Sequence, residues 1–116
     1  MNLNDLARKC CENALRRGKA TKDTQKKDFV TDVIREIIEF DRATPWNTKK
    51  KQNLIDDLEK SKTDAQFQLR FEESLKNYEP NEIADIICVL LTYSHLQGYD
   101  IEKYVNLTVK YNEVRK

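Results

Sequence analysis

Two short acidic motifs in this sequence combine residue types and a spacing that could bind a metal ion. Glu36 and Glu39 lie three residues apart, and so do Glu82 and Asp85. Residues at positions i and i+3 project from the same side of a helix, so each pair presents two carboxylates together. If the two helices are neighbours, the four carboxylates converge on an oxygen-rich pocket. Mg²⁺ and Mn²⁺ take oxygen ligands and bridge to phosphate, so either cation would suit such a pocket.

The sequence around each acid decides how informative it is, because four acid pairs at this spacing are about what chance gives. Asp85 lies inside the apolar run 83–91, where a carboxylate needs a cation, a hydrogen bond or a proton. A salt bridge to a lysine or arginine would satisfy it as well as a metal ion would. Taken alone, Glu36 and Glu39 are typical of a solvated helix edge, and Glu82 is typical of the first turn of a helix.

The elements that must position these acids are predicted to be helices. Charged residues make up 35% of the chain and hydrophobic residues 39%, with only two glycines and two prolines. This composition favours an all-α fold, which we expect to be a helical bundle of about five helices around a four-helix core. The expected helices are Asn4–Arg17, Asp28–Ala43, Gln52–Tyr78, a fourth from Pro80 to Gly98, and a last one capped by Asp100. The third is interrupted by the polar 60–64 and is alternatively two short helices.

Two of these helices carry more apolar surface than a small chain can cover. The second has one apolar stripe at helical spacing, formed by Phe29, Val30, Val33, Ile34, Ile37 and Ile38. The fourth is apolar on nearly every side from Ile83 to Leu91, which predicts a central position. A chain of 116 residues fits one domain, 1–116, with a modest core. We therefore expect a bundle completed by a homodimer or homotetramer.

Charge and cysteine content argue against several classes of partner. The chain has 21 basic and 20 acidic residues, so no overall field attracts it to nucleic acid or to an anionic membrane. The longest apolar run, 86–91, is too short to span a bilayer. Cys10, Cys11 and Cys88 match no zinc or redox motif, and the N-terminal residues lack the apolar stretch of a signal peptide. These features favour a cytoplasmic protein.

The acid pairs also carry a resemblance to a known family. Glu36-Ile-Ile-Glu39 followed by Glu82-Ile-Ala-Asp85 resembles the ExxE and ExxD motifs of the MazG-like, all-α nucleoside triphosphate pyrophosphohydrolases. The segments 81–87, 98–102 and 110–115 are similar to the C-terminal half of that family in order and spacing, and 11–14 with Gly18 resembles its opening helix. The ordered set is specific, although each short motif alone is weak.

The resemblance implies Mg²⁺-dependent hydrolysis of a nucleoside triphosphate to its monophosphate and pyrophosphate. It implies that four acids hold the metal ion and that Glu36 or Glu39 orients or deprotonates the attacking water. It also implies that Lys110 and Arg115 contact phosphate oxygens and that Asn112 binds the sugar or base. The expected role is the removal of particular or non-standard nucleotides from the pool.

Three questions stay open on the sequence alone. The enzyme could be specific for dUTP or dCTP, or the chain could be a non-catalytic helical interaction module that kept the bundle. Lys110, Asn112 and Arg115 are equally typical of an ordinary polar C-terminal helix. Trp46 could stack on a base or simply pack, and Lys49–Lys51 could contact substrate or be solvated.

Overall fold

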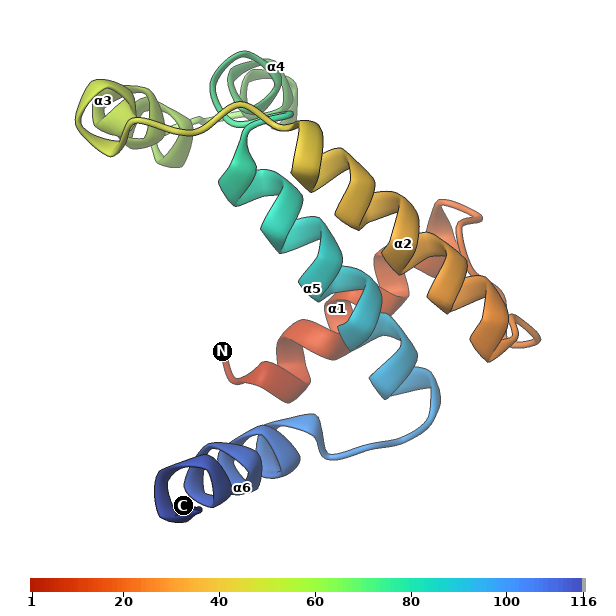
Figure 1. The fold of residues 1–116 in the computed structure, drawn as a ribbon. Helices are drawn as coiled ribbons and strands as arrows, with labels where there is room; N and C mark the ends of the chain where they lie inside the picture. The colour runs from red at the N-terminus through yellow and green to blue at the C-terminus, as the bar shows by residue number, and fades with distance from the viewer. Residues whose placement is uncertain (116) are drawn as a thin grey trace. The chain divides into compact units, whose positions relative to one another are not determined.

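The computed structural model describes residues 1–115; Lys116 and the side chains of residues 48–50 lie outside the description. Within this range the secondary structure is helical, apart from one isolated bridge between Thr44 and Tyr78, and the expected all-α fold is confirmed. The six helices, shown in Figure 1, are α1 (Leu3–Arg16), α2 (Lys26–Arg42), α3 (Thr48–Glu59), α4 (Asp64–Ser74), α5 (Glu79–Leu96) and α6 (Ile101–Val114). No helix in residues 1–115 is both long and apolar enough to cross a membrane.

The chain divides into two compact units. The terminal unit comprises Met1–Val33 and Ile87–Lys116, and the central unit comprises Ile34–Ile86. Helices α2 and α5 each pass from one unit into the other, so each contributes residues to both units. Both acid motifs fall in the central unit.

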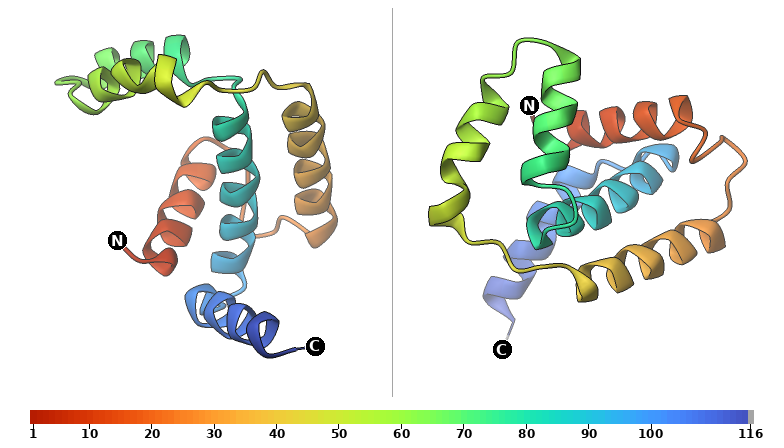
Figure 2. Two further views of the ribbon diagram at one scale, coloured as in Figure 1. Left: turned by 60° about the vertical axis from the view of Figure 1, so that its left-hand side comes forward. Right: turned by 90° about the horizontal axis from the view of Figure 1, so that it is seen from above.

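The sequence leaves open whether residues 52–78 form one helix or two, and the structure has two helices there. The intervening Ser61 and Lys62 are not helical, and the hydroxyl of Thr63 caps α4 by accepting a hydrogen bond from the Gln66 amide. Arg70 on α4 reaches back to α3 and donates to the Asp57 carbonyl at 2.8 Å and to the Ser61 hydroxyl at 3.2 Å. These bonds hold α3 and α4 together as a helical hairpin, visible in Figure 2.

The ends of α2 and α5 are joined by backbone hydrogen bonding. The Glu79 amide donates to the Thr44 carbonyl at 3.1 Å, beside the bridge between Thr44 and Tyr78. Asn77, just before α5, has a φ of 71°, a left-handed conformation that asparagine tolerates better than most residues. From this junction α2 and α5 run side by side in opposite directions, as both figures show. The C-terminal half of α2 therefore lies beside the N-terminal half of α5.

The terminal unit contains most of the well-buried apolar side chains. Phe29 and Tyr93 meet edge to face with ring centroids 5.0 Å apart, an arrangement that aromatic pairs prefer. The buried apolar residues of this unit are Ala7, Cys11, Ala20, Phe29 and Leu91. In the central unit, Leu58 of α3 is the corresponding buried residue.

The apolar surfaces of α2 and α5 are only partly covered within the described chain. On α2 the residues Phe29, Val33, Glu36 and Phe40 are the more buried, whereas Val30, Ile34, Ile37 and Ile38 are close to half exposed. On α5, Ile83, Ile87 and Leu90 are 44%, 47% and 52% exposed. Each helix is apolar on more sides than one chain of this size can cover.

Candidate metal centre

The four predicted acids come together in the central unit, two from each of two adjacent helices. One carboxylate oxygen from each of Glu36, Glu82 and Asp85 lies within 4.8 Å of the others. Glu39 completes the group, because its carboxyl is in hydrogen-bonding contact with those of both Glu36 and Glu82. The three-residue spacing and the antiparallel course of α2 and α5 together explain the convergence. We call these four residues the acid cluster.

Burial distinguishes the members of the acid cluster. Glu82 is only 5% exposed although it lies near the start of α5, and Glu36 and Asp85 are half-buried. Glu39 is exposed. The Oε2 atoms of Glu36 and Glu82 are buried and have no hydrogen-bond partner among the described residues. A buried carboxylate oxygen without a donor is costly, so a proton or a cation is favoured at these two atoms.

The electrostatics of the acid cluster agree with its geometry. Burial raises the pKa of Glu36 to about 7, assisted by its hydrogen bond with Glu39 and by the negative charges of Glu39, Asp85 and Glu82. Burial also raises the pKa of Glu82, assisted by the charges of Asp85 and Glu39 and by contact with Glu39. Two carboxylates about 4 Å apart repel each other by roughly 4 kcal/mol at the effective dielectric near a protein surface. Shared protons or a bound cation would reduce this repulsion.

A divalent cation fits the residues of the acid cluster. All the donors are carboxylate oxygens, which suit Mg²⁺ or Mn²⁺ better than softer ions such as Cu⁺. Two of the oxygens are buried without a donor among the described residues, so a bound cation would offset their desolvation. Because Glu39 is exposed, the cluster is open to solvent on at least one side. Glu36, Glu82 and Asp85 can hold the cation, and Glu39 can reach either the cation or a water beside it.

The three residues predicted to bind substrate lie on α6 in the terminal unit. Lys110 and Asn112 are exposed, and Arg115 is the C-cap residue, with its guanidinium 5.8 Å from the centre of the Tyr111 ring. The acid cluster is built entirely from central-unit residues. The role of Lys110, Asn112 and Arg115 in substrate binding stays a prediction.

A second group of polar contacts lies where α3 and α5 begin, and it includes Lys51 and Trp46, whose roles stay open on the sequence alone. The Lys51 ammonium donates to the Tyr78 hydroxyl at 3.0 Å and lies 4.3 Å from the centre of the same ring. The indole N–H of Trp46 is buried, and no hydrogen-bond partner for it lies among the described side chains. Tyr78 could have been noticed only because it directly precedes Glu79-Pro80 at the start of α5. The side chains of Lys49 and Lys50 lie outside the described residues.

Comparison with known proteins gave no match: no protein-family model, no curated protein and no solved structure matches the chain. The resemblance to MazG-like pyrophosphohydrolases therefore rests on the ordered residues of the sequence itself.

Proposed function

We propose that this chain is a Mg²⁺-dependent nucleotide pyrophosphohydrolase that converts a (deoxy)nucleoside triphosphate to its monophosphate and pyrophosphate. One observation carries the proposal. The four carboxylates of the acid cluster come together from two helices, and two of their oxygens are buried without a hydrogen-bond donor among the described residues. An acid pair on a solvated surface would not need to bury unpartnered oxygens. The resemblance of these same four residues to the MazG-like motifs supports this reaction.

The residues of the acid cluster have distinct roles in this reaction. Glu36, Glu82 and Asp85 would hold the cation, because one oxygen from each lies within 4.8 Å of the others and Glu82 is buried. Bound Mg²⁺ offsets the charge of the triphosphate and makes the α-phosphorus more open to attack. Glu39 is the exposed member, so it orients a water molecule and accepts its proton. The water oxygen forms a bond to the α-phosphorus, the bond to the bridging oxygen breaks, and pyrophosphate leaves.

The remaining parts of the proposal follow from the sequence. Mn²⁺ is an alternative cation, because its ligand preference is similar. Lys110 and Arg115 contact phosphate oxygens, and Asn112 contacts the sugar or base. The protein acts in the cytoplasm on the nucleotide pool, as a homodimer or homotetramer, without nucleic acid or a membrane as partner. Exposed apolar residues on α2 and α5 support oligomerisation, because burial against a second subunit would remove them from water.

Pyrophosphate release from a panel of common and damaged nucleoside triphosphates, with and without Mg²⁺, tests the proposal. We expect Mg²⁺-dependent release from at least one nucleotide, and the preferred base distinguishes a broad enzyme from one specific for dUTP or dCTP. Replacing Glu39 with glutamine removes the proton acceptor but keeps the size of the side chain. This variant should lose nearly all activity and keep its helical circular dichroism signal.

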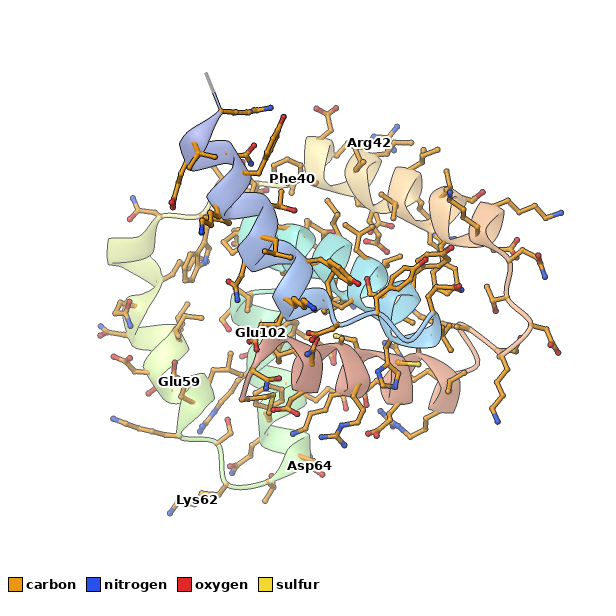
Figure 3. All side chains as sticks on the ribbon, turned by 90° about the horizontal axis from the view of Figure 1, so that it is seen from below. Phe40, Arg42, Glu59, Lys62, Asp64 and Glu102 are labelled. Carbon is orange, nitrogen blue, oxygen red and sulfur yellow. The ribbon has the colours of Figure 1, made fainter. Side chains whose placement is uncertain are left out.

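The matched control is Glu59→Gln on α3, where Figure 3 labels the residue. Glu59 also belongs to an acid pair with three-residue spacing, with Asp56, but it is exposed and is not part of the acid cluster. Its replacement should leave the rate unchanged. An unchanged rate in Glu39→Gln would refute the mechanism, and no release from any nucleotide would favour the non-catalytic interaction module.

A further inference from the structure

The segment that connects α2 to α3 is attached at two points to Tyr78, the residue just before α5. Thr44, where the segment begins, is bridged to Tyr78 and accepts a hydrogen bond from the Glu79 amide. Lys51, at the start of α3, donates from its ammonium group to the Tyr78 hydroxyl at 3.0 Å. Trp46 lies between these two attachment points in the chain, so it belongs to the same small region.

Trp46, Lys51 and Tyr78, which we call the donor group, have hydrogens to donate and are short of acceptors. The recorded contacts of the Lys51 ammonium are a neutral hydroxyl and the face of the same tyrosine ring, and among the described residues Lys51 forms no salt bridge. The Trp46 indole N–H is buried, with no acceptor among the described side chains. A buried donor without an acceptor is costly, so the donor group favours a ligand rich in acceptor oxygens.

The charge around the donor group favours an anion as that ligand. An ammonium group forms its strongest hydrogen bonds with carboxylate or phosphate oxygens. The first turn of α3, which includes Lys51, contains no acidic residue, and the amino end of a helix carries partial positive charge. No negative group of α3 therefore neutralises this end of the helix.

The donor group lies one helical turn from the acid cluster. The Tyr78 carbonyl accepts a hydrogen bond at 3.1 Å from the amide of Glu82, the most buried member of the cluster. One turn advances about 5.4 Å along a helix. The donor group and the acid cluster both belong to the central unit, so this proximity lies within one compact part of the chain.

A nucleoside triphosphate has the charge distribution that these two neighbouring groups require, an argument that rests on the proposed function. The attacked α-phosphorus lies beside the cation and Glu39. The β- and γ-phosphates extend beyond it and carry acceptor oxygens and negative charge, whereas the nucleoside on the other side is uncharged. A cationic group with spare donors therefore suits the β- and γ-phosphates better than the nucleoside.

We propose that the donor group binds the β- and γ-phosphates of the substrate, which leave as pyrophosphate. The Lys51 ammonium and the Trp46 indole N–H donate to phosphate oxygens, and the Tyr78 hydroxyl and ring hold the Lys51 side chain in position. Lys51 and Trp46 are then substrate-binding residues of the central unit, and Tyr78 is a positioning residue.

Trp46 is the only tryptophan in the chain, so its fluorescence reports directly on the donor group. Titration with sodium pyrophosphate, at fixed Mg²⁺ concentration and constant ionic strength, should give a saturable change in the wild type. No turnover is involved, because pyrophosphate is the product. Lys51→Met keeps an unbranched side chain but removes the charge, so the dissociation constant of pyrophosphate should rise about tenfold or more.

The matched control is Lys62→Met, between α3 and α4, where Figure 3 labels the residue. Lys62 is exposed and lies beyond the opposite end of α3 from Lys51. Its replacement removes the same charge from the same unit and should change the dissociation constant less than about twofold. Circular dichroism checks that both variants keep their helical content.

Calorimetry with pyrophosphate tests Trp46 itself, because a variant at this position loses the fluorescent probe. Trp46→Phe keeps an aromatic ring but removes the N–H, and should raise the dissociation constant about threefold or more. In the hydrolysis assay, Lys51→Met should raise KM about tenfold and change kcat much less, because the bound substrate makes the same contact before and during the reaction.

A wild-type chain that shows neither a fluorescence change nor heat on addition of pyrophosphate would overturn the proposal. So would a Lys51→Met variant that binds pyrophosphate as tightly as Lys62→Met does. Hydrolysis with an unchanged KM in Lys51→Met would overturn it and leave the proposed function standing. Pyrophosphate binding that depends on Lys51, without release from any nucleotide, would support the donor group as a pyrophosphate site while the proposed hydrolysis fails.

Discussion

In the acid cluster, two carboxylate oxygens are buried without a hydrogen-bond donor, whereas along α6 six apolar side chains are exposed to water. The first arrangement is costly because charge is removed from solvent, and the second because apolar surface is left in it. The two regions therefore call for different partners. The acid cluster favours a proton or a positive charge, and α6 leaves apolar surface in water. The experiments below separate these two requirements, beginning with the largest expected effect.

Removing one charge from the acid cluster should have the largest effect on activity. In Glu82→Gln the most buried carboxylate becomes a neutral amide of similar size, so the cation loses a ligand. We expect Mg²⁺-dependent pyrophosphate release to fall by about 100-fold or more. Glu79→Gln, one turn earlier on α5, is the control and should keep its activity. Full activity in Glu82→Gln would mean that the acid cluster is not the catalytic metal centre.

Addition of Mg²⁺ should stabilise the wild-type protein strongly. At a Mg²⁺ concentration 100 times its dissociation constant, binding to the folded state alone adds about 2.7 kcal/mol to the free energy of unfolding. For a domain of this size, this is a rise of several degrees or more in the melting temperature. The increment should disappear in Glu82→Gln and persist in Leu107→Lys, which changes an exposed residue of α6. Equal stabilisation of all three proteins would place the binding site elsewhere.

Without metal, the pH dependence of stability should report the crowding of the acid cluster. Burial raises the pKa of Glu36 to about 7 in the folded protein, against 4.5 ordinarily, so between these pH values the folded state binds more protons than the unfolded state. The free energy of unfolding therefore falls as pH rises from about 4.5 to 7. The raised pKa of Glu82 acts in the same direction.

Chemical denaturation with a chelator present, at pH 5 and pH 7.5, measures this effect. We expect a loss of about 1 to 2 kcal/mol at the higher pH, after allowing for the solvent that reaches the Glu36 carboxylate. Glu36→Gln cannot ionise, so it should lose part of this pH dependence and be more stable than wild type at pH 7.5. If the wild type and Glu36→Gln show the same pH dependence, the carboxylates are not crowded in solution.

The smallest expected effect concerns the attachment of α6 to α1. Asn4→Ala removes both the hydrogen bond to Asp100 and the one from the Glu102 amide. We expect a loss of about 1 kcal/mol in the free energy of unfolding, with faster hydrogen exchange at the first turn of α6. Asn13→Ala on the same helix is the control, because Asn13 accepts only a local hydrogen bond from Arg16. No change in α6 exchange would show that this turn is held by other contacts.

Much of the helical structure was predictable because the signals for it are local. The bounds of α1 and α2 lie within two residues of those expected from their periodicity, and Asp100 caps α6 by accepting from the Lys103 amide. The division of 52–78 into α3 and α4 was left open, and the side-chain cap of Thr63 favours two helices. Such features depend on residues three or four apart, which the sequence displays directly.

Burial was less predictable because it depends on which surfaces meet. The apolar stripe of α2 predicted an inner face opposite Glu36 and Glu39, yet Ile34, Ile37 and Ile38 are about half exposed. The fourth helix was expected to be central in an oligomer, and within the single chain Ile83 is 44% exposed. Periodicity shows which residues share a face of a helix, but not which face another element covers when several are apolar.

By itself, the sequence determined the helices, their caps and the two acid pairs at three-residue spacing, because all of these depend on neighbours along one helix. Only the tertiary structure decided that α2 and α5 run antiparallel with Glu36, Glu39, Glu82 and Asp85 facing one another, and that Glu82 is buried among them. It also decided that six large apolar side chains of α6 are exposed. Both results depend on contacts between residues distant in sequence, which the spacing within a single helix does not encode.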